Sequence, residues 1–286
     1  MATVALVLHN DRPAAAQLAR EITGWLAHRG HAVRIPTVDA ECAGLGEHGV
    51  DTSELGVGAD VAVSLGGDGT MLRAIELVAR AGVPVIGVNL GQLGYLTEVE
   101  PAGILDALSQ FFTGSYLIEE RMMLHVSIAS ASGSISVTEA TALNEAVLEK
   151  TVSGHTVRLD VEINGSYFTP YATDGLIVAT PTGSTAYAFS ARGPIIAPTH
   201  RSLLLTPVSP HMLFDRSLIL DAETSLRITV DGYRPAALTV DGRQLGELHE
   251  GDAVICTAAD FVARLVIFGP RDFHRILKSK FGLSDR

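Results

Sequence analysis

The spacing of the apolar residues changes near residue 121, and no other feature of the sequence constrains the fold as strongly. Before this point, short apolar runs at residues 4–8, 61–65 and 83–88 alternate with longer segments whose apolar residues recur at helical spacing. These helical segments are residues 13–29, 71–81 and 104–112. Strands that alternate with helices predict a parallel sheet covered by helices.

Beyond residue 121, apolar and polar residues alternate one by one, which is the pattern of a half-buried strand. Residues 157–163 show this alternation and run into Asn164-Gly165, a pair that strongly favours a hairpin turn. The alternation recurs in residues 226–230 and in residues 238–240, the latter before Asp241-Gly242. This half of the chain therefore predicts an antiparallel β structure in two layers.

Together the two patterns predict an α/β N-terminal domain with a parallel sheet and an all-β, two-layer antiparallel C-terminal domain. We place the α/β domain at residues 1–120 and the β domain at residues 121–265. A C-terminal segment, residues 266–286, contains one more helical stretch, residues 273–281. Because this stretch has no helical neighbour in the β half, we expect it to dock back on the first domain.

Composition restricts the partners and the compartment. Asp and Glu outnumber Lys and Arg by 32 to 21, so the net charge of -11 argues against a nucleic-acid partner, which would require a basic face. The only cysteines are Cys42 and Cys256, which argues against a disulfide framework and suits a reducing compartment. No signal peptide or membrane span is recognisable, so we expect a cytoplasmic protein without a membrane partner.

A glycine-rich turn, G-G-D-G-T at residues 66–70, joins an apolar run to a helical segment. Glycine lets the backbone approach a ligand closely, and the N–H groups at the start of a helix favour phosphate. Asp68 is the unexpected member, since a carboxylate repels phosphate unless it holds a metal or faces a hydroxyl. The turn therefore suggests phosphoryl transfer to an alcohol. Arg73, one helical turn further on, could reach a phosphate, although such an arginine is most often simply solvated.

Three further segments stand out. Asn144-Glu145 lies between apolar residues, Asp174-Gly175 opens a strand, and residues 180–187 read T-P-T-G-S-T-A-Y. Together with the turn and residues 88–96, they closely resemble the NAD kinase family, and the resemblance runs from about residue 61 to residue 283. A glycine turn of this type also occurs in lipid kinases and, loosely, in phosphofructokinases, so the segment 180–187 is the most specific part.

The resemblance implies phosphorylation of the 2′-hydroxyl of the adenosine ribose of NAD, giving NADP. It also implies a homo-oligomer, which we expect to be a homodimer or a homotetramer. ATP is the expected donor, inorganic polyphosphate is a weaker alternative, and a divalent cation, most simply Mg²⁺, should arrive with the donor phosphates. Since the sequence shows no cluster of carboxylates that would form a protein cage for a metal, we assign no metal ligands.

The same resemblance assigns residue roles. Asp68 becomes the general base, and the phosphate-facing turn comprises Gly67, Gly69 and Thr70. The dinucleotide-binding residues are Asn144, Glu145, His155, Asp174, Thr185, Ala186, Tyr187 and Ser190, with Arg73 added on the phosphate side. Elementary chemistry agrees: a Glu145 carboxylate accepts from a ribose diol, Asn144 both donates and accepts toward adenine, and Tyr187 offers a face for stacking.

One position departs from the family pattern. Relatives usually carry Gly-Gly-Pro where this chain has Arg192-Gly193-Pro194. An arginine there predicts either that a positive φ is not required or that the loop has shifted.

Two other functions remain open at this stage. A lipid or sugar kinase would share the glycine turn, but a lipid kinase should present a basic or apolar membrane-facing surface, which this acidic chain does not suggest. A catalytically silent NAD-binding regulator would have no need of Asp68 within an intact turn.

Overall fold

The computed structural model describes residues 1–91, 94–130, 133, 135–270 and 272–283. The chain forms two compact units, one made of Met1–Glu120 with Ala263–Arg286 and the other of Arg121–Val262. The chain passes from one unit to the other within two long strands, β6 (Leu117–Ala129) and β17 (Ala253–Ile267).

The first unit contains a parallel sheet in the order β5–β4–β1–β2–β3, and Leu265 of β17 pairs in parallel with Val85 of β5. The strands are β1 (Thr3–Leu8), β2 (Ala32–Pro36), β3 (Gly49–Val50), β4 (Val61–Gly66) and β5 (Val85–Asn89). The two central strands, β1 and β4, are almost entirely buried, which explains their continuous apolar sequences.

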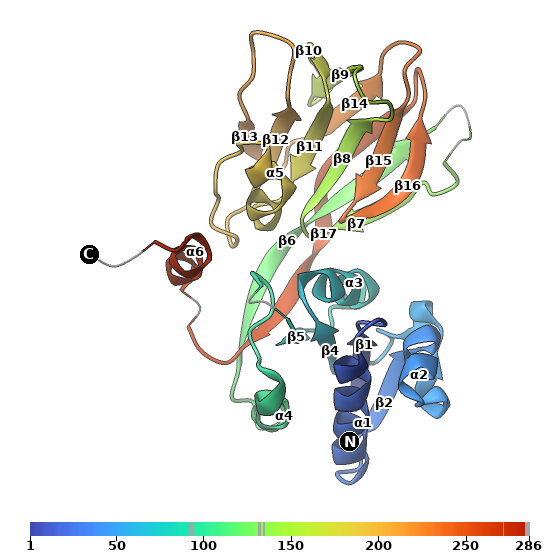
Figure 1. Ribbon diagram of the computed structural model, residues 1–286, viewed down its shortest axis with the longest axis vertical. Helices are drawn as coiled ribbons and strands as arrows, with labels where there is room; N and C mark the ends of the chain where they lie inside the picture. Colours follow the sequence, from blue (N-terminus) through green and yellow to red (C-terminus); the bar gives the residue numbers. More distant parts are fainter. Residues whose placement is uncertain (92–93, 131–132, 134, 271, 284–286) are drawn as a thin grey trace. The chain divides into compact units, whose positions relative to one another are not determined.

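Helices cover both faces of this sheet (Figure 1). They are α1 (Pro13–Ala27), α2 (Thr37–Ala43), α3 (Asp68–Val78) and α4 (Ile104–Phe112), with short 3-10 turns at Gly46–His48, Thr52–Glu54, Ala79–Ala81 and Pro101–Gly103. Apolar residues of α1, α2 and α4 share one core with alternate strand residues such as Leu6 and Val63. Figure 1 shows α3 on the opposite side of the strands, where it packs against β4.

The second unit contains two sheets. One includes β10, β9, β14 and β17 in that order with β6 and β7, and the other has the order β13–β12–β11–β8–β15–β16. The bounds are β7 (Glu139–Ala142), β8 (Glu145–Lys150), β9 (Val157–Ile163), β10 (Ser166–Thr173), β11 (Gly175–Ala179), β12 (Ser202–Val208), β13 (Leu218–Asp221), β14 (Leu226–Val230), β15 (Ala236–Val240) and β16 (Arg243–Leu248).

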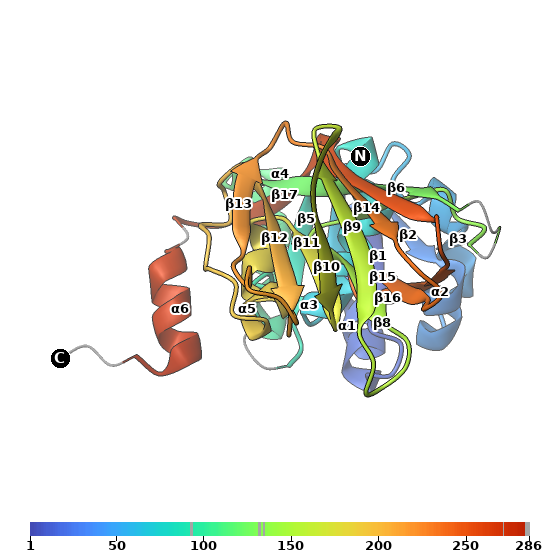
Figure 2. The same cartoon turned by 90° about the horizontal axis from the view of Figure 1, so that it is seen from above.

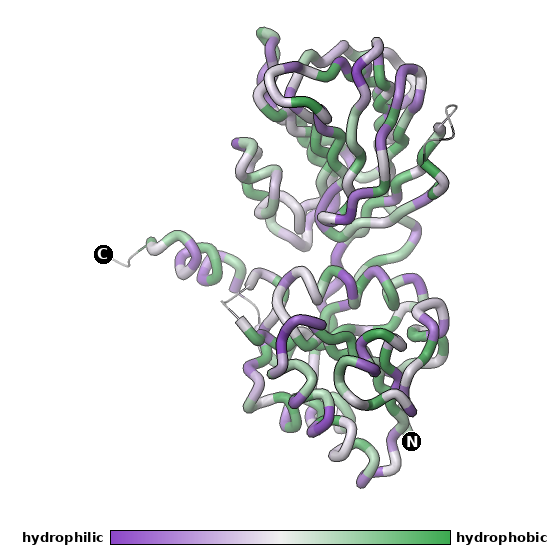
Figure 3. Tube along the Cα trace, turned by 45° about the vertical axis from the view of Figure 1, so that its right-hand side comes forward, coloured by the Kyte–Doolittle hydropathy of each residue, from purple (hydrophilic) through white to green (hydrophobic). Residues whose placement is uncertain are grey.

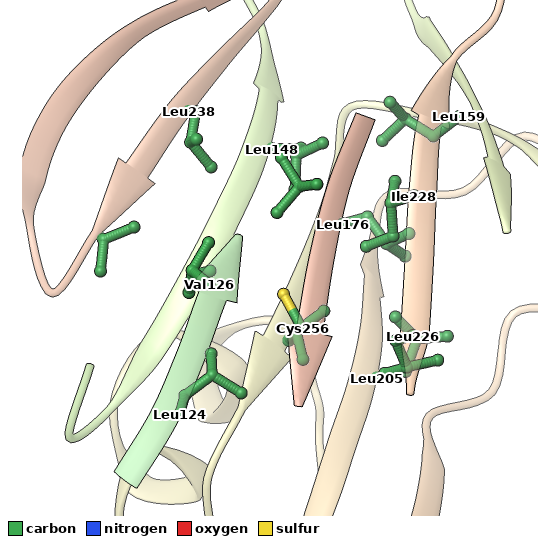
Figure 4. Packing of buried hydrophobic residues seen from close by; sticks show 14 of the residues in the cluster. Leu124, Val126, Leu148, Leu159, Leu176, Leu205, Leu226, Ile228, Leu238 and Cys256 are labelled. Atoms are coloured by element: carbon green, nitrogen blue, oxygen red, sulfur yellow. The ribbon is translucent and has the colours of Figure 1, made fainter. Parts of the chain in front are cut away.

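The core of the second unit lies between the two sheets. Figure 4 shows Leu124 and Ile228 from one sheet packed with Leu148, Leu176 and other residues from the second sheet. A 3-10 turn (Thr182–Thr185) and a short helix, α5 (Tyr187–Ser190), follow β11. Helix α5 lies against β11 (Figure 2), so it covers the outer face of the second sheet with a small apolar cluster of its own.

The predicted fold class is confirmed: a parallel α/β unit is combined with an antiparallel, two-layer β unit. Both predicted hairpin turns form, with positive φ at Asn164 and Gly165 and at Asp241 and Gly242. One boundary differs from the prediction, because α3 begins at Asp68 rather than at residue 71. In the part of the chain that the structure describes, no helix is long and apolar enough to cross a membrane.

The last helix, α6 (Phe273–Phe281), forms where the sequence predicts it and belongs to the first unit. Its turns carry both apolar and hydrophilic residues (Figure 3), and none of its residues is fully buried. Lys280 of this helix contacts Tyr95 of the same unit: its ammonium nitrogen lies 5.2 Å from the centre of the Tyr95 ring.

The backbone at Arg192 corrects the sequence-based expectation. Arg192 has a φ of 65°, so the left-handed conformation is required there although the residue is not glycine. The Arg192 N–H donates to the Phe189 carbonyl at 3.0 Å, and the Gly193 N–H donates to the Ala188 carbonyl at 2.8 Å. These bonds close the carboxyl end of α5, which is where helices usually place a left-handed glycine.

Replacing Arg192 by Gly should therefore stabilise the protein. A left-handed non-glycine residue costs about 1–2 kcal/mol. Glycine removes this cost, but it also makes the unfolded chain more flexible, which offsets about 0.4–1 kcal/mol of the stabilisation. We expect the free energy of unfolding in urea to rise by about 0.5–1 kcal/mol, the difference between these two terms. Arg192→Ala is the matched control, because it removes the side chain but keeps the Cβ atom; an equal gain in that variant would contradict the explanation.

Candidate active site

The glycine turn forms the junction between β4 and α3. Gly67 is the N-cap residue of the helix; its backbone is extended, and it has no side chain to cap the N–H groups of the first helical turn. A Cβ atom on Gly66 would lie 2.1 Å from the Thr70 hydroxyl oxygen, so only glycine fits at that position. The uncapped helix start is suited to bind an anion, as the sequence predicts.

A pocket of about 400 Å³ opens beside this turn. Its walls are residues 8–12, which follow β1, together with Gly67, Gly69, Thr70 and Arg73. Strands β1 and β4 are parallel neighbours, so both loops leave the sheet at its carboxyl edge, where α/β proteins bind ligands. The predicted phosphate-facing residues are thus brought together in one pocket.

Arg73 is anchored rather than freely solvated. Its guanidinium forms an ion pair with the fully buried Asp39 and donates to the Leu8 carbonyl at 2.7 Å. Asp39 also accepts the Leu8 N–H at 2.8 Å. The pair fixes Arg73 at the wall of the pocket, while 37% of its side chain stays exposed. Sequence analysis missed Asp39, since nothing in the sequence relates α2 to α3.

Asp68 is held by the backbone of the loop that follows β5. Its carboxylate accepts the N–H groups of Tyr95 and Leu96 at 2.8 and 3.1 Å. A Cβ atom on Gly94 would lie 2.0 Å from Asp68 Oδ1, so glycine is needed for this close approach. The family-like segment 88–96 therefore orients the Asp68 side chain, although its residues 92–93 lie outside the described part of the chain.

In the second unit, the segment Leu143–Glu145 is enclosed by two other segments. The Asp241 carboxylate accepts all three of its N–H groups, and the Asn144 carbonyl accepts the Thr180 N–H at 2.8 Å. A Cβ atom on Gly183 would lie 2.2 Å from the Asn144 carbonyl oxygen. The T-P-T-G-S-T-A-Y segment thus packs directly on the Asn-Glu pair, and glycine is required for this contact.

Glu145 is buried, and its Oε2 atom has no hydrogen-bond partner among the described residues. Burial, and then the charge of Asp241, raise the pKa of Glu145 to about 8, while the Tyr187 N–H lowers it. At pH 7 most of this carboxyl is therefore protonated. The structure differs here from the sequence-based expectation of a carboxylate: a neutral acid donates one hydrogen bond and accepts another.

Tyr187 is held at both ends by glutamates of β8. Its N–H donates to Glu145, and its phenol donates to Glu149 Oε1. Burial, and then this hydrogen bond and the charges of Glu149 and Asp174, raise the pKa of the phenol to about 12. Glu145 and Glu149 lie on the same face of β8 because they are four residues apart in a strand. Sequence analysis missed Glu149.

The other predicted dinucleotide residues occupy different surroundings. Asp174 forms an ion pair with Lys150 at 2.7 Å, and the Thr185 hydroxyl donates to the Thr182 carbonyl at 3.2 Å. Ala186 directly precedes α5. His155 is exposed in the connection between β8 and β9, so its proximity to NAD stays a prediction.

A second pocket, of about 770 Å³, is formed entirely by the second unit. Its lining includes Tyr187, Ser190 and Arg192 together with residues 207–210 and 215–217. Its volume falls within the range of about 300–1,000 Å³ that small-molecule sites usually have. The structure thus brings Tyr187 and Ser190 to one pocket, whose lining does not include the other predicted dinucleotide residues.

Comparison with known proteins identifies the family. Models of the ATP-NAD kinase N-terminal domain and C-terminal domain match residues 4–116 and 143–268. An NAD kinase from Moorella thermoacetica is 39% identical over 98% of this chain and 89% of its own length. One from Heliobacterium modesticaldum is 40% identical over 98% of both chains. This chain belongs to the NAD kinase family.

Solved structures agree with that assignment. Yeast NADH kinase complexed with NADH matches with a TM-score of 0.90 and 25% identity, covering 100% of this chain and 89% of the yeast chain. An NAD kinase from Archaeoglobus fulgidus in complex with ATP matches with a TM-score of 0.74, 23% identity and 98% coverage of both chains, and shows the same fold.

The raised pKa of Glu145 predicts a pH-dependent stability. The pKa is about 4.5 in the unfolded chain and about 8 in the folded protein, so the folded state binds more protons between these values. The contribution of Glu145 to the free energy of unfolding is therefore fully present below a pH of about 4.5, and it is lost as the pH rises through about 8. In urea unfolding, the free energy should fall by up to about 1.4 kcal/mol per pH unit within this window.

Glu145→Gln is the matched variant, because it keeps the shape of the side chain and removes the titration. Its free energy of unfolding should change less steeply over the same pH range. Equal slopes in the two proteins would contradict the assignment of this titration to Glu145.

Proposed function

We propose that this protein transfers the γ-phosphoryl group of ATP to the 2′-hydroxyl of the adenosine ribose of NAD, giving NADP and ADP. The observation that carries this proposal beyond family membership is the buried carboxyl oxygen of Glu145, within the Asn-Glu pair, that finds no hydrogen-bond partner among the described residues. A buried polar atom without a partner is costly, and a ribose diol offers both a donor and an acceptor to satisfy it.

The remaining residues take complementary roles. Asn144 and Tyr187 bind the adenosine, with Thr185, Ala186, Ser190 and Asp174 as further dinucleotide contacts. The N–H groups of Gly67, Gly69 and Thr70 hold the donor phosphates, and Arg73 adds a positive charge that Asp39 keeps in place. The N–H bonds from residues 95 and 96 fix the Asp68 carboxylate in one orientation.

In the reaction, a bond forms between the 2′-oxygen and the γ-phosphorus, and the bond from that phosphorus to the bridging oxygen of ADP breaks. ADP leaves with the electron pair, and the hydroxyl proton passes to Asp68. Phosphoryl transfer usually has a loose transition state, so orientation of the hydroxyl contributes as much as proton removal.

Purified protein incubated with NAD and ATP should produce NADP, measured with an NADP-specific dehydrogenase. The same preparation is offered diacylglycerol or fructose 6-phosphate with labelled ATP. Phosphorylation of either in place of NAD would favour the lipid or sugar kinase alternative. NAD binding without any product would identify a silent regulator.

Asp68→Asn should lower kcat by about 10²–10⁴-fold, the usual contribution of a positioned general base, and should barely change KM for NAD. Asp51→Asn is the matched control, since Asp51 also accepts a backbone N–H, that of Ser53 at 2.8 Å, in the same unit. Thermal melting verifies that both variants are folded. A kcat within about threefold of the wild type would remove Asp68 from catalysis.

We propose that Mg²⁺ enters with ATP. The described residues contain no group of three or more His, Cys, Asp or Glu suited to hold a metal ion, and Asp68 is the carboxylate at the phosphate turn. Mg²⁺ commonly binds through substrate phosphates and one or two carboxylates, and it would neutralise phosphate charge. Excess chelator should abolish NADP formation and added Mg²⁺ should restore it; activity that survives chelation would contradict the proposal.

Two further properties belong to the same proposal. A donor that is held through its phosphates by N–H groups needs few contacts from its nucleoside. Inorganic polyphosphate should therefore also support NADP formation, and no product with polyphosphate as sole donor would contradict this.

The protein works in the cytoplasm as a homodimer or homotetramer, and a monomeric mass in light scattering would overturn the assembly.

A further inference from the structure

We infer that Asp241 is a positioning residue for the dinucleotide site, acting through the backbone of Leu143–Glu145. This inference rests on the proposed function, since it concerns how the Asn-Glu pair is held. Asp241 belongs to the turn between β15 and β16, and it lies 96 residues from Glu145 in the sequence.

The contact geometry is specific. Asp241 Oδ2 accepts the Leu143 N–H at 2.7 Å, while Oδ1 accepts the N–H groups of Asn144 and Glu145 at 2.9 and 3.0 Å. The Asp241 N–H in turn donates to the Glu145 carbonyl at 3.0 Å. Three consecutive N–H groups therefore point at one carboxylate, which is a strong and orientation-specific arrangement.

The turn presents Asp241 in the required direction. Asp241 and Gly242 both have positive φ, as a two-residue hairpin turn requires, and Asp tolerates this conformation better than most residues. From the other side, the Thr180 N–H and the close approach of Gly183 hold the Asn144 carbonyl. Asn144 and Glu145 are thus fixed between two turns before either side chain meets a ligand.

Asp241 also places a negative charge beside the Glu145 carboxyl. The groups that face this carboxyl are Asp241 from the β15–β16 turn and the Tyr187 N–H from α5, while Glu149 lies further along the same face of β8. The charge of Asp241 raises the pKa of Glu145, second only to burial. A neutral residue at 241 should therefore shift the titration of Glu145 to lower pH. A substitution that only loosened the fold at another position would not cause this shift.

Asp241→Asn tests the inference, with Asp252→Asn as the matched control. Asp252 is fully buried in the same unit and also accepts a backbone N–H in a turn, that of His249 at 2.9 Å. Asp241→Asn should raise KM for NAD about tenfold, because a displaced Asn-Glu pair loses about one hydrogen bond to the dinucleotide, and one such bond corresponds to roughly a factor of ten in affinity. It should change kcat by less than about threefold, as expected for a lost ground-state contact.

Two further readouts complete the experiment. The pH at which KM for NAD changes should move to lower values in Asp241→Asn and stay in place in Asp252→Asn. Amide hydrogen exchange at residues 143–145 should accelerate in Asp241→Asn alone, a measurement that does not depend on activity. If Asp241→Asn does not fold, Asp241→Glu takes its place, because it keeps the charge and displaces the carboxylate by one methylene.

The outcomes are distinguishable. A wild-type protein that makes no NADP from NAD rejects the proposed function, while exchange at residues 143–145 still decides the role of Asp241. An active wild type with unchanged KM, pH profile and exchange in Asp241→Asn overturns the positioning role. Failure of both Asp241 variants to fold, with Asp252→Asn folded, would also overturn it, because Asp241 would then support the whole unit.

Discussion

Aspartate carboxylates that accept backbone N–H groups hold the loops on which the candidate site depends. Asp68 binds residues 95 and 96 in the first unit, and Asp241 binds residues 143–145 in the second. Asp39 does the same for Leu8 while it anchors Arg73. One carboxylate satisfies two or three N–H groups at once, so a loop keeps a single geometry without the support of a helix or a sheet.

Close backbone approach is the second requirement, and glycine meets it. A Cβ atom on Gly66, Gly94 or Gly183 would lie between 2.0 and 2.2 Å from Thr70, Asp68 or Asn144, respectively. Each of these glycines belongs to a different family-like segment of the sequence. These glycines therefore let each segment pack closely against a residue that has a role in the proposed function.

At Glu145 the arrangement lowers the stability of the folded protein. Its carboxyl is buried beside a second carboxyl, and one of its oxygens has no partner in the part of the chain that the structure describes; such a group destabilises the folded protein relative to a satisfied or apolar side chain. Tyr187 partly compensates, since its N–H donates to Glu145 and its phenol to Glu149. Functional sites commonly contain groups that lower stability, and a ligand with its own donors and acceptors would satisfy the Oε2 oxygen of Glu145.

The sequence by itself determined the two-part architecture, because a strand–helix pattern and a period-two pattern specify different packing, and it located both Asn-Gly and Asp-Gly hairpin turns. It also located the motif residues, whose types and spacing are local. Only the tertiary structure showed that Asp39, Glu149 and Asp241 orient them, because these contacts join residues far apart in the chain. The sequence also could not predict the left-handed backbone at Arg192 or the raised pKa of Glu145. Helix closure and desolvation depend on what the fold packs around a residue.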